Sequence, residues 1–343
     1  MKRFSIPILL TLVSLSVTFA IAELFLQHVM PVEFMPPPKD RSHEAWRGLL
    51  HRASDIPGLN YELAPNMEKH SKHGFIQTNS FGMRDTEPLL ADTPGLIRIA
   101  CVGDSFTFGF SVAGDKTYPN ILEQLLQSST SVPGERSVDV LNFGVGGYST
   151  KDEALIIKHK VLTWKPRLIV IGYVLNDPEI DPRQPLHAQF AHTDWWRRSH
   201  VLRLAAKAKF EWDKNRIGGG DYLKYLHAPK KRKWQSVITA FHEIYQATAE
   251  KGIPVIVVLF PPIPSKGWEY YEYYDINSQI VQAAIDAGLD TLDLTVTFKE
   301  HEPANLKVKP NDGHPSILGH RLAAEAIRDK LLIHYPDVLT ILR

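Results

Sequence analysis

The sequence predicts an α/β fold, a three-layer α/β/α sandwich in which helices cover both faces of a parallel sheet. Five short runs from Ile97 onward are almost entirely apolar, as expected for strands buried on both faces. The longer segments between them carry apolar residues at the spacing of a helix. Strands and helices that alternate in this way are typical of such a sandwich, for which residues 95–335 are long enough.

Each element of this sandwich can be placed on the sequence. The strands are expected at Ile97–Val102, Val138–Phe143, Leu168–Val174, Pro254–Phe260 and Thr291–Leu294. The helices are expected at Tyr118–Gln127, Lys151–Leu162, Lys233–Lys251, Ile276–Ala287 and Ile317–His334. Residues 178–231 form an insertion with a further helix near Leu202–Trp212. Because the insertion follows the third strand, we expect it at the ligand-binding edge of the sheet, as a lid or a substrate platform.

The N-terminus predicts export of the chain. A basic pair, Lys2-Arg3, precedes an uncharged and mostly apolar run from Phe4 to Ala22. Such a run can cross a bilayer core, which needs about 20 residues. Ala20-Ile21-Ala22 also resembles a signal-peptidase site. In both interpretations the basic residues stay in the cytoplasm. A retained anchor is favoured over a cleaved signal because apolar residues resume at Leu24-Phe25-Leu26.

The chain is therefore expected to have three parts: a signal anchor or signal peptide at 1–23, a tether and small extension at 24–94, and the domain at 95–335. The extension contains Pro36-Pro37-Pro38 and lacks a sustained period. Thr78–Asp85 is predicted to form a tight turn. Arg84 in that turn is expected to form a structural salt bridge, or else to reach the rim of the site.

Composition excludes several function classes. The formal net charge is +1, which gives no electrostatic reason to expect a nucleic-acid partner. Cys101 is the single cysteine, so an internal disulfide framework and a Cys-rich metal site are excluded. Its position in an apolar strand predicts a buried, packed side chain. The sequence lacks a zinc-peptidase helix, a Walker loop and a G-x-S-x-G elbow, and no metal or organic cofactor is expected.

Ser105 is the first candidate for chemistry. Gly103-Asp104-Ser105 follows the first strand and precedes a helical segment, which places the serine at the carboxyl edge of the sheet. Unpaired backbone N–H groups and the helix dipole favour a developing negative charge there. Ser105 is therefore a candidate nucleophile, and the alternative is a turn or helix-cap residue.

The ends of the next two strands carry candidate donors for an oxyanion. Gly144-Val145-Gly146-Gly147 would let the backbone approach a substrate closely, or else serve only tight strand-to-helix packing. Asn176 follows the third strand, and its amide could donate to an oxyanion or form an Asx-turn into Pro178.

Asp312 and His314 are expected on a loop directly before the last helix. A serine nucleophile needs a base, and the base needs a carboxylate to orient its imidazole. His314 is distinguished from the other histidines by its adjacent acid and by its place at the correct edge of the sheet.

These blocks, in this order, resemble the SGNH (GDSL-type) hydrolase family. Thr78–Arg84 also resembles an upstream Thr-Asn-Ser-x-Gly-x-Arg element of its bacterial membrane-anchored branch. The resemblance covers about residues 94–333 and implies the SGNH fold with a flavodoxin-like, five-stranded sheet. It further implies a serine esterase in which Ser105 is the nucleophile and His314, partnered by Asp312, is the base. The oxyanion donors implied are the N–H groups of Ser105 and Gly147 and the Asn176 amide.

Two blocks depart from the family's pattern. Val174 stands two residues before Asn176, where the family usually has glycine, and the nearest glycine is Gly172. Asn311 stands three residues before His314, where the family usually has an acid. Asp312 could act from its shifted place, a backbone carbonyl could support a serine–histidine pair, or Asp293 could be the partner.

The function expected is hydrolysis of carboxylic esters, O-acetyl groups in particular, on an extracytoplasmic glycan or a small molecule. The domain would then lie in the periplasm or at the cell surface, or be secreted if the signal is cleaved. Trp195, Trp196 and Trp268 could stack on sugar rings or simply pack. The alternatives are a polysaccharide O-acyltransferase, a lipase or thioesterase, and a non-catalytic carbohydrate-binding relative. A large separation of Ser105 from His314 would favour the last.

Overall fold

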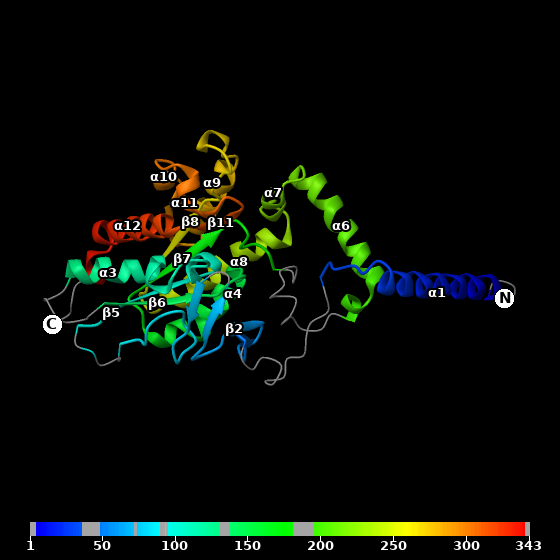
Figure 1. Ribbon diagram of the computed structural model, residues 1–343, viewed down its shortest axis with the longest axis horizontal. Helices are drawn as coiled ribbons and strands as arrows, with labels where there is room; N and C mark the ends of the chain where they lie inside the picture. The colour runs from blue at the N-terminus through cyan, green and yellow to red at the C-terminus, as the bar shows by residue number, and fades with distance from the viewer. Residues whose placement is uncertain are drawn as a thin grey trace. The chain divides into compact units, whose positions relative to one another are not determined.

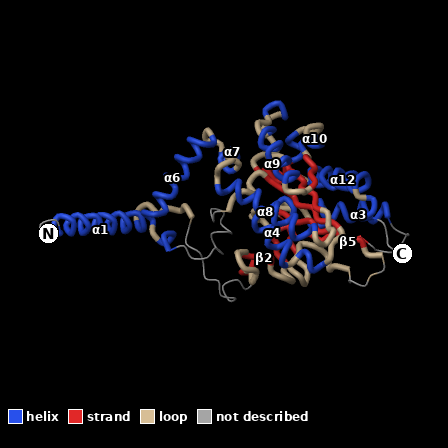
Figure 2. Tube along the Cα trace, turned by 180° about the vertical axis from the view of Figure 1, so that it is seen from behind, coloured by secondary structure: helices blue, strands red, loops and turns tan. Residues whose placement is uncertain are grey.

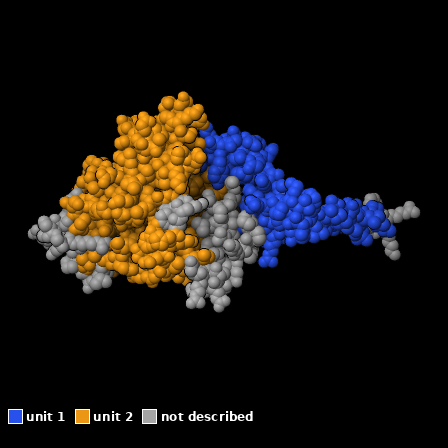
Figure 3. All heavy atoms as spheres, viewed as in Figure 1, with its two compact units in different colours: residues 1–41, 181–225 blue, residues 42–180, 226–343 orange. Residues whose placement is uncertain are grey.

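The computed structural model describes residues 5–35, 49–71, 74–89, 93, 95–130, 138–180 and 195–339. The chain divides into two compact units, residues 1–41 with 181–225 and residues 42–180 with 226–343 (Figure 3). The predicted proline tether at 36–38 and residues 181–194 of the predicted insertion lie outside the described residues.

A parallel five-stranded sheet forms the centre of the larger unit (Figure 1). Its strands are β5 (Ile97–Gly103), β6 (Val138–Gly144), β7 (Leu168–Val174), β8 (Val255–Phe260) and β9 (Asp290–Asp293). They lie in the order β6-β5-β7-β8-β9, with every neighbouring pair parallel. In chain order this is the flavodoxin-like arrangement. The predicted SGNH fold class is confirmed, and each strand lies within one residue of its predicted bounds.

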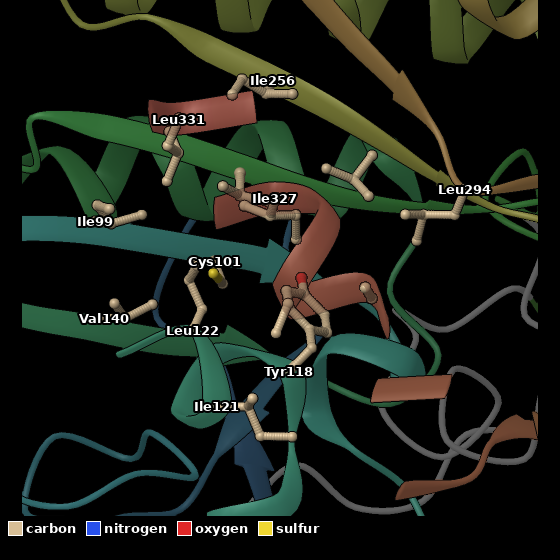
Figure 4. Close-up of a cluster of buried hydrophobic side chains, with 14 of the residues drawn as sticks. Ile99, Cys101, Tyr118, Ile121, Leu122, Val140, Ile256, Leu294, Ile327 and Leu331 are labelled. Carbon is tan, nitrogen blue, oxygen red and sulfur yellow. The ribbon is translucent and has the colours of Figure 1, made fainter. Parts of the chain in front are cut away.

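Five long helices cover this sheet: α3 (Tyr118–Thr130), α4 (Thr150–His159), α8 (Arg232–Ala249), α9 (Tyr274–Asp286) and α12 (Ile317–His334). Helix α3 packs against α12, whereas α4 and α9 both pack against α8 (Figures 1 and 2). Both faces of the sheet are covered. Alternate strand residues such as Ile99 and Cys101 join the core of α3 and α12 (Figure 4). On β7, Tyr173 packs its ring against Phe241 of α8 instead.

Serine caps explain where two of these helices begin. The Ser149 side chain and the Asp152 side chain form a reciprocal capping box at the start of α4. The Ser316 hydroxyl accepts from the Gly319 N–H at the start of α12. Helix α4 ends three residues before its predicted end, at His159, and the chain continues in a 3-10 turn at Val161–Trp164.

Several short elements carry too few residues to show a period in the sequence. They are the helices α2 (Ser105–Phe108), α7 (Tyr222–Leu226), α10 (Thr295–Phe298) and α11 (Pro303–Leu306), and the antiparallel pair β10 (Lys307–Lys309) and β11 (Asp312–Pro315). The remaining 3-10 turns span Gly114–Lys116, Trp195–Arg198, Trp268–Tyr270 and Pro336–Leu339.

The extension before the sheet forms two antiparallel pairs. They are β1 (His51–Ala53) with β2 (Tyr61–Leu63), and β3 (Glu68–Ser71) with β4 (Gly74–Gln77). The predicted tight turn follows β4. The Asn79 side chain accepts from the N–H groups of Phe81 and Met83, and Gly82 has a φ of 73°.

Arg84 does not form the salt bridge that was expected from the sequence. Its buried guanidinium donates to the carbonyl oxygens of Phe108 at 2.8 Å and Val112 at 2.7 Å, and also to that of Gly109. Within the described ranges the structure gives Arg84 no carboxylate partner. The expected salt bridge is therefore wrong. The guanidinium instead donates to the backbone carbonyls of Phe108, the last residue of α2, and of the turn after it.

The smaller unit contains α1 (Ser5–His28) and α6 (His200–Gly218). Residues Ile6–His28 have a mean hydropathy of 2.2 and no buried side chains, so α1 is long and apolar enough to cross a membrane. A signal sequence meets the same criterion. Within this unit, the Glu23 carboxylate accepts from the N–H groups of His200 and Val201 and thereby caps α6.

Candidate active site

Ser105 lies where strand β5 gives way to helix α2. Asp104 is the N-cap of this helix, and its carboxylate accepts from the Phe106 N–H at 2.8 Å. Its other oxygen accepts from the Ser105 hydroxyl at 3.2 Å. The helix ends after one turn at Gly109, whose φ is 81°. Ser105 is thus the first residue of the helix, and the alternative in which it is the cap is wrong.

Glycine at three strand ends lets α2 lie directly on the edge of the sheet. A Cβ atom on Gly144 would lie 2.1 Å from the Phe108 backbone nitrogen. A Cβ atom on Gly103 or Gly172 would lie 2.1 Å or 2.5 Å from the Thr107 hydroxyl oxygen. Any other residue at these positions would push α2, and Ser105 with it, away from the sheet.

His314 reaches Ser105 from strand β11. Its Nε2 atom lies 2.9 Å from the Ser105 hydroxyl oxygen, and its Nδ1 atom lies 2.6 Å from Asp312 Oδ1. The same carboxylate oxygen accepts from the His314 backbone N–H at 3.1 Å. The ring packs against Phe106 and Phe110, with centroid separations of 5.3 and 4.7 Å. Hydroxyl, imidazole and carboxylate therefore lie in hydrogen-bonding sequence.

The local strand accounts for the shifted acid. The sequence predicted a loop at residues 312–314, whereas the structure has β11 paired with β10. Residues i and i+2 of a strand point to the same side, which sets Asp312 beside His314. Asp293 is directed elsewhere, because its carboxylate accepts from the Thr295 N–H at 2.8 Å. Of the three arrangements left open by the sequence, the structure has the one with Asp312.

The other two predicted blocks also meet at Ser105. The Asn176 side-chain nitrogen lies 3.4 Å from Asp104 Oδ2, next to the serine. A Cβ atom on Gly146 would lie 4.0 Å from Ser105 Cβ, so the glycine loop runs past the same side chain. Gly147, which follows, has a φ of 83°.

Val174 does not prevent this arrangement. Its N–H donates to Asp177 Oδ2 at 3.0 Å, and the Asp177 N–H donates back to the Val174 carbonyl at 2.9 Å. This reciprocal pair closes the turn after β7. The Asp177 carboxylate thus accepts from an N–H three residues before it, which differs from the Asx-turn that the sequence offered as an alternative for Asn176.

Three buried carboxyl groups, those of Asp104, Glu153 and Asp177, interact with one another beside the site, and their cluster is not evident from the sequence. Burial raises the pKa of Asp104, opposed by the hydrogen bonds that it accepts from Phe106, Asn176 and Ser105. Burial also raises the pKa of Glu153 and of Asp177 well above the usual range, and repulsion among these carboxylates adds to it. Glu153 is fully buried on the face of α4 that also buries Ala154, Ile156 and Ile157, and an acid at such a position is the signal that could have indicated this cluster.

Two other features bear on what the site can bind. In the described part of the chain, no group of three or more His, Cys, Asp or Glu side chains could hold a metal ion. A cavity of about 760 Å³ is lined by residues of the β3–β4 pair, the turn after it and residues 111–115. Neither Ser105 nor His314 lines that cavity.

Comparison with known proteins adds an independent finding. The family model of the GDSL-like Lipase/Acylhydrolase family matches residues 101–322. No curated protein matches the chain.

Solved structures also match. The acetylxylan esterase Axe2 from Geobacillus stearothermophilus is 17% identical, with 70% of this chain and 95% of that chain covered and a TM-score of 0.43. The α/β hydrolase LAE5 from the metagenome of Lake Arreo is 17% identical, with 67% of this chain and 92% of that chain covered and a TM-score of 0.44. The acetyl xylan esterase AlAXEase is 18% identical, with 68% of this chain and 100% of that chain covered and a TM-score of 0.44.

Proposed function

The chain belongs to the GDSL-like lipase/acylhydrolase family and is a hydrolase that acts on ester bonds. From this we propose that it is a serine esterase that works through an acyl-enzyme on Ser105. One observation carries the proposal: His314 lies 2.9 Å from the Ser105 hydroxyl on one side and 2.6 Å from Asp312 on the other. Each neighbour in this sequence is close enough for a proton to be shared.

The first half of the proposed reaction makes the acyl-enzyme. His314 Nε2 takes the Ser105 proton as the serine oxygen forms a bond to the ester carbonyl carbon. Asp312 accepts from Nδ1–H, which keeps the ring in the correct tautomer and stabilises its charged form. The bond to the alcohol oxygen then breaks, and His314 gives the proton to that oxygen. In the second half, water loses a proton to His314 as its oxygen bonds to the acyl carbon. The bond between that carbon and the Ser105 oxygen then breaks, His314 returns the proton to Ser105, and the carboxylic acid leaves.

The negative charge of each tetrahedral intermediate needs donors at the sheet edge. We propose the backbone N–H groups of Ser105 and Gly147 and the side-chain amide of Asn176. An amide nitrogen carries two hydrogens, and Asn176 directs one toward Asp104, which leaves a second for the oxyanion. Loss of one such donor typically costs about 3–4 kcal/mol of transition-state stabilisation.

For the substrate we propose an O-acetyl ester on a glycan. Trp195, in the smaller unit, presents an exposed indole on which a sugar ring could stack, because the residue is 77% exposed although side chains of this size are usually covered. Trp268 does not, because it packs against the core and its indole N–H donates to the His301 carbonyl at 2.9 Å. Release of acetate from an acetylated polysaccharide, measured against release from a long-chain acyl ester, tests this choice. Preference for the long-chain ester would favour a lipase.

For the location we propose a chain held by α1 with the hydrolase domain outside the cytoplasm. The support is the apolar character of Ile6–His28 and the basic pair before it. The intact mass of the membrane-bound protein distinguishes an anchor from a cleaved signal, because cleavage at Ala22 removes the preceding residues.

Hydrolysis of short aryl acetates by the full-length chain in detergent micelles tests the esterase proposal. Removing the nucleophile or the base from such a site lowers kcat by roughly 10⁴-fold or more, so Ser105→Ala and His314→Ala are expected to lose nearly all turnover. Ser278→Ala is the matched control, since this exposed hydroxyl on α9 only bonds the Tyr274 carbonyl. Equal turnover in the wild type and Ser105→Ala would eliminate the proposal.

A further inference from the structure

The glycine loop beside Ser105 contains a tight turn with glycine at both central positions. The Tyr148 N–H donates to the Val145 carbonyl at 3.1 Å, which closes a four-residue turn around Gly146 and Gly147. Of the two glycines, Gly147 has a positive φ of 83° and Gly146 does not. This combination is the signature of a type II turn.

A turn of this sequence has a second conformation available. Type I and type II turns differ by about 150° in ψ of the second residue and about 170° in φ of the third. The difference amounts to a flip of the central peptide, here the one that joins Gly146 to Gly147. Glycine at both positions removes the steric penalty that would otherwise favour one orientation. A contact outside the turn can therefore favour one of the two forms.

Tyr61 of strand β2 supplies that contact. Its hydroxyl donates to the Gly146 carbonyl at 2.9 Å, and its ring is 1% exposed. The Tyr148 hydroxyl donates to the backbone carbonyl of Tyr61 at 2.7 Å, a bond in which the 146–147 peptide takes no part. Burial raises the pKa of Tyr61 further above its usual value, so the phenol keeps its proton and remains a donor throughout the working pH range.

The orientation of this peptide decides where the Gly147 N–H points. In a trans peptide the carbonyl and the N–H point in opposite directions. With the Gly146 carbonyl held by Tyr61, the Gly147 N–H is directed away from Tyr61. The peptide lies beside the nucleophile, because a Cβ atom on Gly146 would be 4.0 Å from Ser105 Cβ.

We propose that Tyr61 is a positioning residue for ester hydrolysis: its hydroxyl holds the 146–147 peptide in the orientation in which the Gly147 N–H faces the oxyanion. The inference rests on the proposed function, because it assigns a role in the same site. Strand β2, which precedes the family domain in the sequence, thereby becomes part of the catalytic apparatus.

The experiment compares Tyr61→Phe with Tyr148→Phe in the full-length chain in detergent micelles. Both variants lose one buried hydroxyl from the same pair of rings, whose centroids are 5.5 Å apart, but only Tyr61→Phe removes the hydroxyl that donates to the Gly146 carbonyl. For Tyr61→Phe we expect kcat on an aryl acetate to fall about tenfold, equivalent to about 1.4 kcal/mol, with KM unchanged. Tyr148→Phe is expected to keep kcat within about twofold, a difference of under 0.5 kcal/mol.

A second measurement separates positioning from general loosening. An arylboronic acid forms a tetrahedral adduct with a reactive serine and places an oxygen where the oxyanion develops. Its affinity for Tyr61→Phe is expected to fall by the same factor as kcat, as for a transition-state analogue. A wild-type kcat in Tyr61→Phe, equal losses in the two variants, or a change confined to KM would overturn the inference. Full activity in Ser105→Ala would overturn the proposed function instead, whatever Tyr61→Phe does.

Discussion

In the proposed reaction, the orientation of the His314 imidazole decides whether Ser105 can be deprotonated. His314 contacts Ser105 with one nitrogen and Asp312 with the other, and two phenylalanine rings hold its faces. A ring held on both nitrogens has one tautomer suited to accept the serine proton, with Nδ1–H directed at the carboxylate. The proposed role of the carboxylate is therefore to hold this tautomer and to stabilise the charged ring.

Replacing Asp312 tests this assignment at the residue scale. Asp312→Asn keeps the size of the side chain but favours the wrong tautomer of His314, which in a comparable triad lowered kcat by about 10⁴. We expect a loss of roughly 10²- to 10⁴-fold in kcat on aryl acetates, with little change in KM.

Asp293→Asn is the matched control. Asp293 accepts from the Thr295 N–H, and asparagine can accept the same bond, so activity and melting temperature should stay close to those of the wild type. A larger loss from Asp293→Asn than from Asp312→Asn would assign the partner to the wrong acid.

At the scale of elements, one turn of helix depends on the ends of three strands. Helix α2 rests on β5, β6 and β7 through Gly103, Gly144 and Gly172, and each of these glycines leaves less than 3 Å for a Cβ atom. Gly144 is the most constrained of them, because the atom that it would meet belongs to the backbone of α2.

Gly144→Ala is therefore expected to destabilise the protein and misplace Ser105. Overpacking of this kind typically costs about 1–3 kcal/mol, and occasionally more. We expect a lower midpoint of urea denaturation together with a lower kcat. Gly114→Ala serves as the control, because nothing lies within 4 Å of its Cβ and its φ is not positive. An unchanged midpoint and kcat in Gly144→Ala would contradict the packing described for α2.

The same scale shows which elements a sequence can reveal. The five strands of the sheet were predicted to within one residue, and β5, β6, β7 and β8 are runs of residues buried on both faces, whereas the edge strand β9 is only half-buried. Helix α2 and the pair β10–β11 were missed because three or four residues cannot display a period. The missed strand β11 sets Asp312 beside His314, two residues along the same strand. An acid partner for His314 is therefore present although Asn311 stands where the family usually has the acid.

At the scale of the whole molecule, the site is assembled from distant parts of one chain. Ser105 and His314 are separated by 209 residues, and Tyr61 and Gly146 by 85. The first pair could be predicted, because parallel strands bring their carboxyl ends to one edge of the sheet. The contact between Tyr61 and Gly146 could not be predicted, because β1 and β2 are not strands of the central sheet and its strand order does not place them. A tyrosine in a three-residue strand also shows no pattern that would mark it as buried.

The most direct test of the central claim is covalent trapping of the nucleophile. The full-length chain is treated with an aryl phosphonate, which transfers a phosphonyl group to an activated serine, and the modified residue is located by peptide mass spectrometry. We predict one modification, on Ser105, which slows by at least about 10³-fold in His314→Ala and does not occur in urea-unfolded protein. Labelling of another residue, or equal labelling of Ser105 in His314→Ala, would contradict the account.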